Sequence, residues 1–166
     1  MIRTKDIEYQ ISGLTRARVL AIGHVVTQWA ALQEQIDQEI TELGKLAACV
    51  GFRPAKILRD NVENRLAAWR DMSLAAYSDD QSRAWVEQIW REAEELRPER
   101  DAAVHAIWGT SKRLTIELRQ KRGEPASIRE RPNLTREMED CAKRISQINA
   151  LHLRLGVRVA DMQPED

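Results

Sequence analysis

The sequence predicts a mainly α-helical protein, a four- to five-helix bundle with a small β-hairpin inserted near residues 113–130. Apolar residues recur at helical spacing through most of the 166-residue chain. Only 7 residues are Gly and 5 are Pro, which argues against a loop-rich all-β fold. Hydrophobic residues make up 43% of the chain and the net charge is zero, so disorder is not expected. The length is typical of a single domain, 1–166, with its core over 15–157 and frayed ends.

The first helix is expected over residues 15–43. Its apolar stripe repeats every seven residues at Ile22, Trp29, Ile36 and Leu43, with Val25 or Val26, Leu32 and Ile40 at intermediate positions. The polar residues that follow Leu32, Glu39 among them, are expected outside this stripe, and Gly44 is placed to end the helix. A heptad-like stripe on a helix this long favours a homodimer.

The next two helices show the same periodicity. One is expected over 54–76, because Pro54 suits a first helical turn. Another is expected to begin after Ser78-Asp-Asp-Gln81, a pattern typical of a capping box that satisfies free backbone N–H groups. Pro98 is expected to break or kink this helix, since proline lacks the N–H that helical hydrogen bonding needs.

The pattern changes near residue 113. Residues 113–118 alternate between polar and apolar, which indicates a strand, and Gly123 suits the turn of a hairpin. Thr135 is then expected to cap a last helix over 135–157. Because a striped helix cannot bury its apolar face alone, the helices are expected to pack as a bundle.

The neutral total hides a basic segment at residues 112–131, which has seven basic and three acidic residues and therefore a charge of +4. The basic residues are Lys112, Arg113, Arg119, Lys121, Arg122, Arg129 and Arg131. Such a strip could attract phosphate, or it could be an ordinary solvated surface of mixed charge.

Several classes of site are missing from the sequence. It has no Gly-rich phosphate loop, no His-Glu-x-x-His or Glu-x-x-His motif, and no Gly-x-Ser-x-Gly elbow. The two cysteines, Cys49 and Cys141, are far apart and are expected to be small buried hydrophobic residues. His24 is expected to be a packed or partly exposed histidine, and His152 a hydrogen-bonded histidine of the core or an interface, rather than catalytic residues. No metal and no cofactor is therefore expected.

One stretch carries groups that can act together, Arg-Asp-Ala-Ala-Val-His-Ala-Ile-Trp from Arg100 to Trp108. On a helix, Arg100 and His105 lie about 7.5 Å apart along the axis and about 140° apart around it, so both can flank one groove. Asp101 lies one turn before His105 and could orient the imidazole. A histidine can move protons at neutral pH and a guanidinium can hold phosphate, which suffices for metal-free RNA cleavage through the 2′-hydroxyl.

This stretch resembles the HEPN family (higher eukaryotes and prokaryotes nucleotide-binding), whose signature is Arg, four to six residues, then His, late in a helical bundle. Arg100-x4-His105 fits that spacing, with Val104 before the His and Trp108 three residues after it. The order of elements over roughly 15–157 is similar to a bacterial subgroup with a long first helix, the Arg/His helix, a basic hairpin and a final helix.

The resemblance implies a homodimer in which Arg and His from both chains meet in a cleft. Many members are metal-independent endoribonucleases of toxin–antitoxin or phage-defence systems, and some pair with an antitoxin protein, while others lack demonstrable activity. His105 would then be the general acid/base and Arg100 the phosphate ligand, with Asp101 orienting His105. RNA binding without cleavage, or a non-catalytic dimeric helical interaction module in which these residues make structural bonds, are the alternatives.

The N-terminal residues Met1 to Glu8 contain no apolar segment typical of a secretory signal. No stretch approaches the roughly 20 apolar residues that span a bilayer. The protein is therefore expected in the cytoplasm, without a membrane partner and with both thiols reduced.

Overall fold

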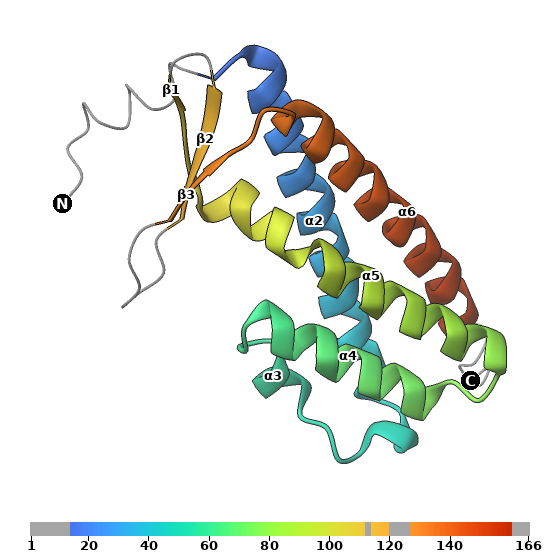
Figure 1. Ribbon diagram of the computed structural model, residues 1–166. Helices are drawn as coiled ribbons and strands as arrows, with labels where there is room; N and C mark the ends of the chain where they lie inside the picture. Colours follow the sequence, from blue (N-terminus) through green and yellow to red (C-terminus); the bar gives the residue numbers. More distant parts are fainter. Residues whose placement is uncertain (1–13, 112–113, 120–126, 161–166) are drawn as a thin grey trace. The chain divides into compact units, whose positions relative to one another are not determined.

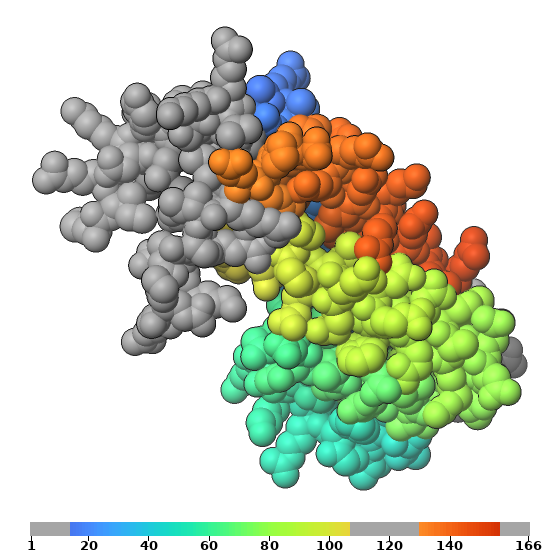
Figure 2. Space-filling view, viewed as in Figure 1, coloured from blue at the N-terminus to red at the C-terminus, as the bar shows by residue number. Residues whose placement is uncertain are grey.

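The computed structural model describes residues 14–111, 114–119 and 127–160, and describes side chains over 14–106 and 130–156. Figure 2 shows these residues in colour in a space-filling view. The described chain is mainly helical and forms a helical bundle, which confirms the predicted fold class at this level. The helices of four residues or more are α2 (Arg16–Leu43), α3 (Pro54–Ile57), α4 (Val62–Ala76), α5 (Asp80–His105) and α6 (Leu134–Ala160) (Figure 1).

The chain folds as two compact units, each assembled from segments that are distant in the sequence. The Arg100 unit contains the described residues up to Trp29 together with Arg97–Arg144. The Glu39 unit contains Ala30–Leu96 and the described residues from Ile145 onward. Helices α2, α5 and α6 each contribute residues to both units.

The Arg100 unit contains an antiparallel sheet with strand order β1-β2-β3 (Figure 1). Its strands are β1 (Ile107–Ser111), β2 (Leu114–Arg119) and β3 (Ser127–Glu130). Gly109 pairs with Ile116, and Ile116 in turn pairs with Glu130. Strand β1 starts two residues after α5 ends, so the sheet directly follows the helix that carries His105.

The Glu39 unit has an apolar core drawn from four helices. Its fully buried members include Leu32, Ile40, Trp69, Met72, Val86, Ile89 and Ile148. Helix α4 is joined to α5 by Arg70, which donates two hydrogen bonds to the Glu87 carboxylate and lies over the Trp90 ring at 4.7 Å from its centroid.

Helix α2 agrees closely with the expected span and ends at Leu43, just before Gly44. A Cβ atom at Gly44 would collide with the Pro54 ring, so this position needs glycine for close approach of the following segment. The predicted stripe is buried at Val25, Trp29, Leu32, Ile36, Ile40 and Leu43. It therefore packs inside the chain and is not available to pair two copies.

Two predicted boundaries in the second and third helices are wrong, each for a local reason, and Pro98 does not break the third helix, which was one of the two effects expected of it. The helix expected over 54–76 is interrupted, because the Asn61 side chain caps a new helix by accepting from the Asn64 backbone N–H at 2.9 Å. Asp79 rather than Ser78 caps α5, accepting from the Ser82 N–H at 2.8 Å. Helix α5 also continues through Pro98 to His105. Pro98 removes one backbone N–H donor, but the turns before and after it remain helical, so the helix continues.

The last helix, α6, begins at Leu134, so Thr135 lies in its first turn and not at its cap. Among the described residues, no helix is both long enough and apolar enough to cross a lipid bilayer.

Candidate functional site

The predicted site lies in the last turns of α5, within the Arg100 unit. Ala102 and Ala103 are buried there and fix the inward face of the helix, whereas Val104 and His105 are exposed. Arg100, Asp101 and His105 all lie on this one helical segment, as the sequence predicted. The arrangement of their side chains decides what they can do together.

Arg100 is mostly covered, with 15% of its side chain exposed. Its guanidinium carbon lies 5.5 Å from the centroid of the Trp29 ring of α2, at a distance suited to a cation–π contact. Its Nη1 donates a hydrogen bond of 2.8 Å to Oδ1 of Asp101, whose side chain is 42% exposed. Arg100 is therefore fixed in position and already bound to a carboxylate.

His105 is exposed at the C-terminal end of α5. Within the described side chains, no hydrogen bond or ion pair joins His105 to Asp101 or to Arg100. The Asp101 carboxylate lies one turn away and binds Arg100 instead. The three predicted residues are thus neighbours on one helix, and only Arg100 and Asp101 are in direct contact.

Arg131 does not belong to a phosphate-attracting surface. It is only 2% exposed, and its guanidinium donates to Glu99 at 2.6 Å and to Glu137 at 2.6 Å. This buried cation joins the segment after β3 to α5 and α6 inside the Arg100 unit. The side chains of the other six basic residues of 112–131 lie outside the described residues.

Cys141 lies near the same group of charges and is buried, as predicted. Burial is the main reason why the pKa of its thiol is raised to about 11, and the negative charge of Glu99 adds to the shift. A thiol with so high a pKa is protonated at neutral pH and is a poor nucleophile. Cys49 is buried as well, and burial raises the pKa of its thiol too.

A second polar cluster lies in the core of the Glu39 unit, and the sequence analysis missed it. Its four members are Glu39, Trp69, Tyr77 and His152, all of them buried. Glu39 was expected to face solvent. Instead Trp69 Nε1 and Tyr77 Oη each donate a hydrogen bond of 3.0 Å to its carboxylate. The partners come from residues 30 or more positions away, so no local pattern could have revealed them.

His152 completes this cluster from α6, as a core histidine in agreement with the prediction. Its Nε2 lies 2.6 Å from Glu39 Oε2, an ion-pair distance, although the ring N–H is not aligned for a hydrogen bond. Its ring packs against Trp69 with 5.5 Å between centroids. Desolvation, together with the Glu39 charge, holds the pKa of Tyr77 far above its ordinary value. The cluster is sealed from solvent and has no access for a substrate.

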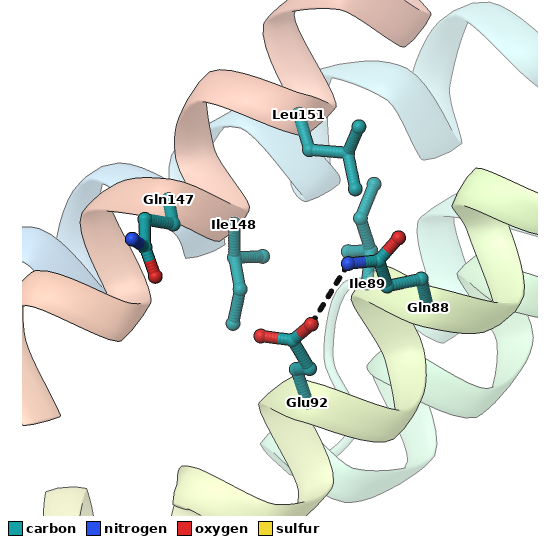
Figure 3. A pocket seen from close by; sticks show the side chains of 6 residues that line it. All are labelled: Gln88, Ile89, Glu92, Gln147, Ile148 and Leu151. Carbon is teal, nitrogen blue, oxygen red and sulfur yellow. Dashed lines mark hydrogen bonds between the residues drawn. The ribbon is translucent and has the colours of Figure 1, made fainter.

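A small groove of about 180 Å³ lies between α5 and α6 of the Glu39 unit (Figure 3). Ile148 and Leu151 of α6 point toward α5, and Glu92 of α5 points toward Ile148. Gln88 Nε2 donates to Glu92 Oε1 at 2.9 Å at its rim. The residues that line the groove supply one carboxylate and two amides but neither a cation nor a nucleophile, so the groove has no side chain suited to holding phosphate.

Among the described residues, no group of three or more His, Cys, Asp or Glu side chains could hold a metal ion. No protein-family model matches the chain, and no curated protein or solved structure matches it significantly.

Proposed function

We propose that the protein is a HEPN-like, metal-independent endoribonuclease in which His105 transfers protons and Arg100 binds the scissile phosphate. The observation that carries this proposal is the exposed imidazole of His105, five residues after an arginine that Trp29 fixes in place. Asp101 completes the predicted set as the carboxylate one turn before His105. We expect such an enzyme to act in the cytoplasm, in a toxin–antitoxin or defence system.

The reaction uses the nucleophile that RNA itself supplies. His105 takes the proton of a 2′-hydroxyl, and the 2′-oxygen attacks the adjacent phosphorus. The bond from phosphorus to the 5′-oxygen breaks, and that oxygen leaves as an alcohol after taking a proton from the imidazolium. The products are a 2′,3′-cyclic phosphate and a 5′-hydroxyl, with no net gain or loss of protons.

Arg100 would stabilise the negative charge that grows on the phosphate oxygens during this attack. A guanidinium suits this task because it stays protonated and presents several N–H donors in one plane. Contact with the Trp29 ring keeps it in one position before the substrate arrives. Imidazole and guanidinium together supply the proton transfer and charge stabilisation for which other nucleases use a metal ion.

A homodimer is part of this proposal. It would form through a different face of α2 from the heptad stripe that suggested it. The heptad stripe of α2 is buried, but Val19, Leu20 and Val26 of the same helix are exposed. Gly23, between them, has open space around the position of a Cβ atom, which permits close approach of another helix. No Asp, Glu, Lys or Arg occurs from Val19 to Gln33, so two copies could pair along this face without charge repulsion.

The alternative function is a non-catalytic dimeric interaction module, for example one that pairs with an antitoxin protein. The Arg100–Asp101 ion pair favours it, because Arg100 already has the carboxylate partner that a structural arginine needs. On this view His105 would have no chemical role.

Purified protein incubated with RNA in EDTA separates the two functions. We expect cleavage by the wild type, and a loss of about 10²–10⁴-fold in rate for His105→Ala, the range typical of a general acid/base. His24→Ala is the control, because His24 is also an exposed helical histidine, and the mass of this variant must show that the dimer is intact, since His24 lies in the α2 segment proposed to pair. Equal inactivity of the wild type and His105→Ala on varied RNAs would disprove the nuclease and favour the interaction module.

A further inference from the structure

The Asp101 carboxylate accepts a hydrogen bond from Arg100, the residue that the proposed function assigns to phosphate binding. Arg100 Nη1 donates to this carboxylate at 2.8 Å, although Asp101 also lies one helical turn before His105, on the same face of the helix. We infer that Asp101 is a built-in competitor for the RNA phosphate at Arg100, and that phosphate must displace it before the site is complete. This inference rests on the proposed function and concerns the control of that same site.

The competition follows from the chemistry of the two anions. Carboxylate and phosphate oxygens both accept hydrogen bonds from guanidinium N–H groups, and both prefer the same planar fork. An Nη1 hydrogen atom that is bound to Asp101 cannot be donated fully to a phosphate oxygen. The negative charge of Asp101 also repels an approaching phosphodiester, whose charge has the same sign.

The same contact is weak enough to be exchanged. The Asp101 side chain is 42% exposed, so water can solvate it when it leaves Arg100. A single hydrogen bond joins this exposed carboxylate to the mostly covered Arg100, so only one contact must break for the exchange. A phosphate that enters between the two side chains would therefore meet a low barrier.

Arg100 does not depend on Asp101 for its position. Its guanidinium lies over the Trp29 ring, and Trp29 is itself buried in the Arg100 unit. Release of Asp101 would thus leave the arginine in place and expose the Nη1 donor that Asp101 held. Once released, Asp101 lies one helical turn from His105, within reach of the imidazole that the proposed function asks it to orient.

The chain offers a matched control in the other unit. Arg70 Nη1 donates to the neighbouring Asp71 at 3.2 Å, and Arg70 also lies over a tryptophan, Trp90. Asp71 is 57% exposed, comparable to Asp101. Asp71→Asn therefore makes the same change in net charge and breaks the same kind of adjacent Arg–Asp pair, at a distance from the proposed site along the chain.

The test measures binding of a short fluorescently labelled single-stranded RNA by anisotropy, in EDTA, with His105→Ala in every protein to prevent cleavage. We expect Asp101→Asn to tighten binding about fivefold, because it removes the competing carboxylate and one repulsive charge. Asp71→Asn should change the affinity by less than about twofold, and Arg100→Gln should weaken it.

Each outcome has a separate meaning. A fivefold gain for Asp101→Asn that disappears in Asp101→Asn/Arg100→Gln would support competition at Arg100. If Arg100→Gln weakens binding but Asp101→Asn has the same effect as Asp71→Asn, or weakens binding, the inference is wrong and the proposed function stands. If none of the proteins binds RNA and the wild type does not cleave it, the proposed function fails and this inference with it.

Discussion

Arg131 and Glu39 are charged side chains that the fold buries, each with partners from other elements. Arg131 donates to Glu99 and Glu137, and Glu39 accepts from Trp69 and Tyr77. A charge can leave water only when such partners replace the hydration that it loses. Composition and periodicity predict that charged residues lie on the surface. Arg131 was therefore expected in a basic surface segment, and Glu39 outside the apolar stripe of its helix.

At the residue scale, Arg131→Ala should destabilise the protein by about 3 kcal/mol, because it leaves two carboxylates beside a cavity without their cation. Urea unfolding followed by circular dichroism measures the loss.

The control for this substitution is Arg136→Ala on α6. Arg136 is 86% exposed and lies 3.9 Å from Asp140, so its removal should change the free energy of unfolding by less than about 0.5 kcal/mol. Equal effects of the two substitutions would contradict a structural role for Arg131.

The sequence predicted that Arg100, Asp101 and His105 lie on one helical segment, which the structure confirms, but it did not predict which of them are in contact. Spacing alone put Arg100, Asp101 and His105 on one helical segment, since rise and twist per residue are fixed. It also suggested that Asp101 faces His105, because residues four apart on a helix are neighbours. In the structure Asp101 binds Arg100, whose side chain Trp29 holds close by. The sequence could not supply that contact with Trp29, which is 71 positions earlier.

At the scale of elements, apolar periodicity predicted the long helices, whereas local capping hydrogen bonds decided boundaries that periodicity did not predict. Helix α2 and the body of α6 follow their apolar stripes. The interruption before α4 depends on one Asn61 side chain, and the start of α5 depends on Asp79 rather than Ser78. Such choices are decided by single hydrogen bonds, worth about 1 kcal/mol each, that periodicity does not detect.

The Glu39 cluster is expected to fix how α2, α4 and α6 pack within the Glu39 unit. Glu39→Gln should lower the free energy of unfolding by about 3 kcal/mol, because an amide group would face two buried donors and a histidine without the acceptor charge that they need. Thermal and urea unfolding measure the change.

Glu42→Gln is the control for that substitution. Glu42 lies on the same helix three residues later, and it pairs with exposed Lys45 at 2.7 Å. Its loss should cost less than about 1 kcal/mol. If Glu39→Gln is no more costly than Glu42→Gln, the buried cluster does not stabilise the fold.

At the scale of the whole molecule, the proposed dimer depends on the exposed apolar face of α2. Light scattering coupled to size-exclusion chromatography should give twice the chain mass of 19.1 kDa. Leu20→Glu should shift the protein to monomer, because it places a charge at the centre of a dry interface.

Leu153→Glu is the control, because Leu153 is exposed on α6 and lies outside the proposed interface. It should leave the mass unchanged. A wild-type protein that is monomeric at micromolar concentration, or a dimer that Leu20→Glu leaves intact, would contradict this interface.

The central claim is that one imidazole and one guanidinium on α5 cleave RNA through its own 2′-hydroxyl. Analysis of the product ends tests this claim most directly. We expect the wild type, in EDTA, to leave 2′,3′-cyclic phosphate and 5′-hydroxyl ends, and to leave a fully 2′-O-methylated strand of the same sequence intact. Products with 5′-phosphate ends, cleavage of the methylated strand, or the same products at the same rate from His105→Ala would contradict it.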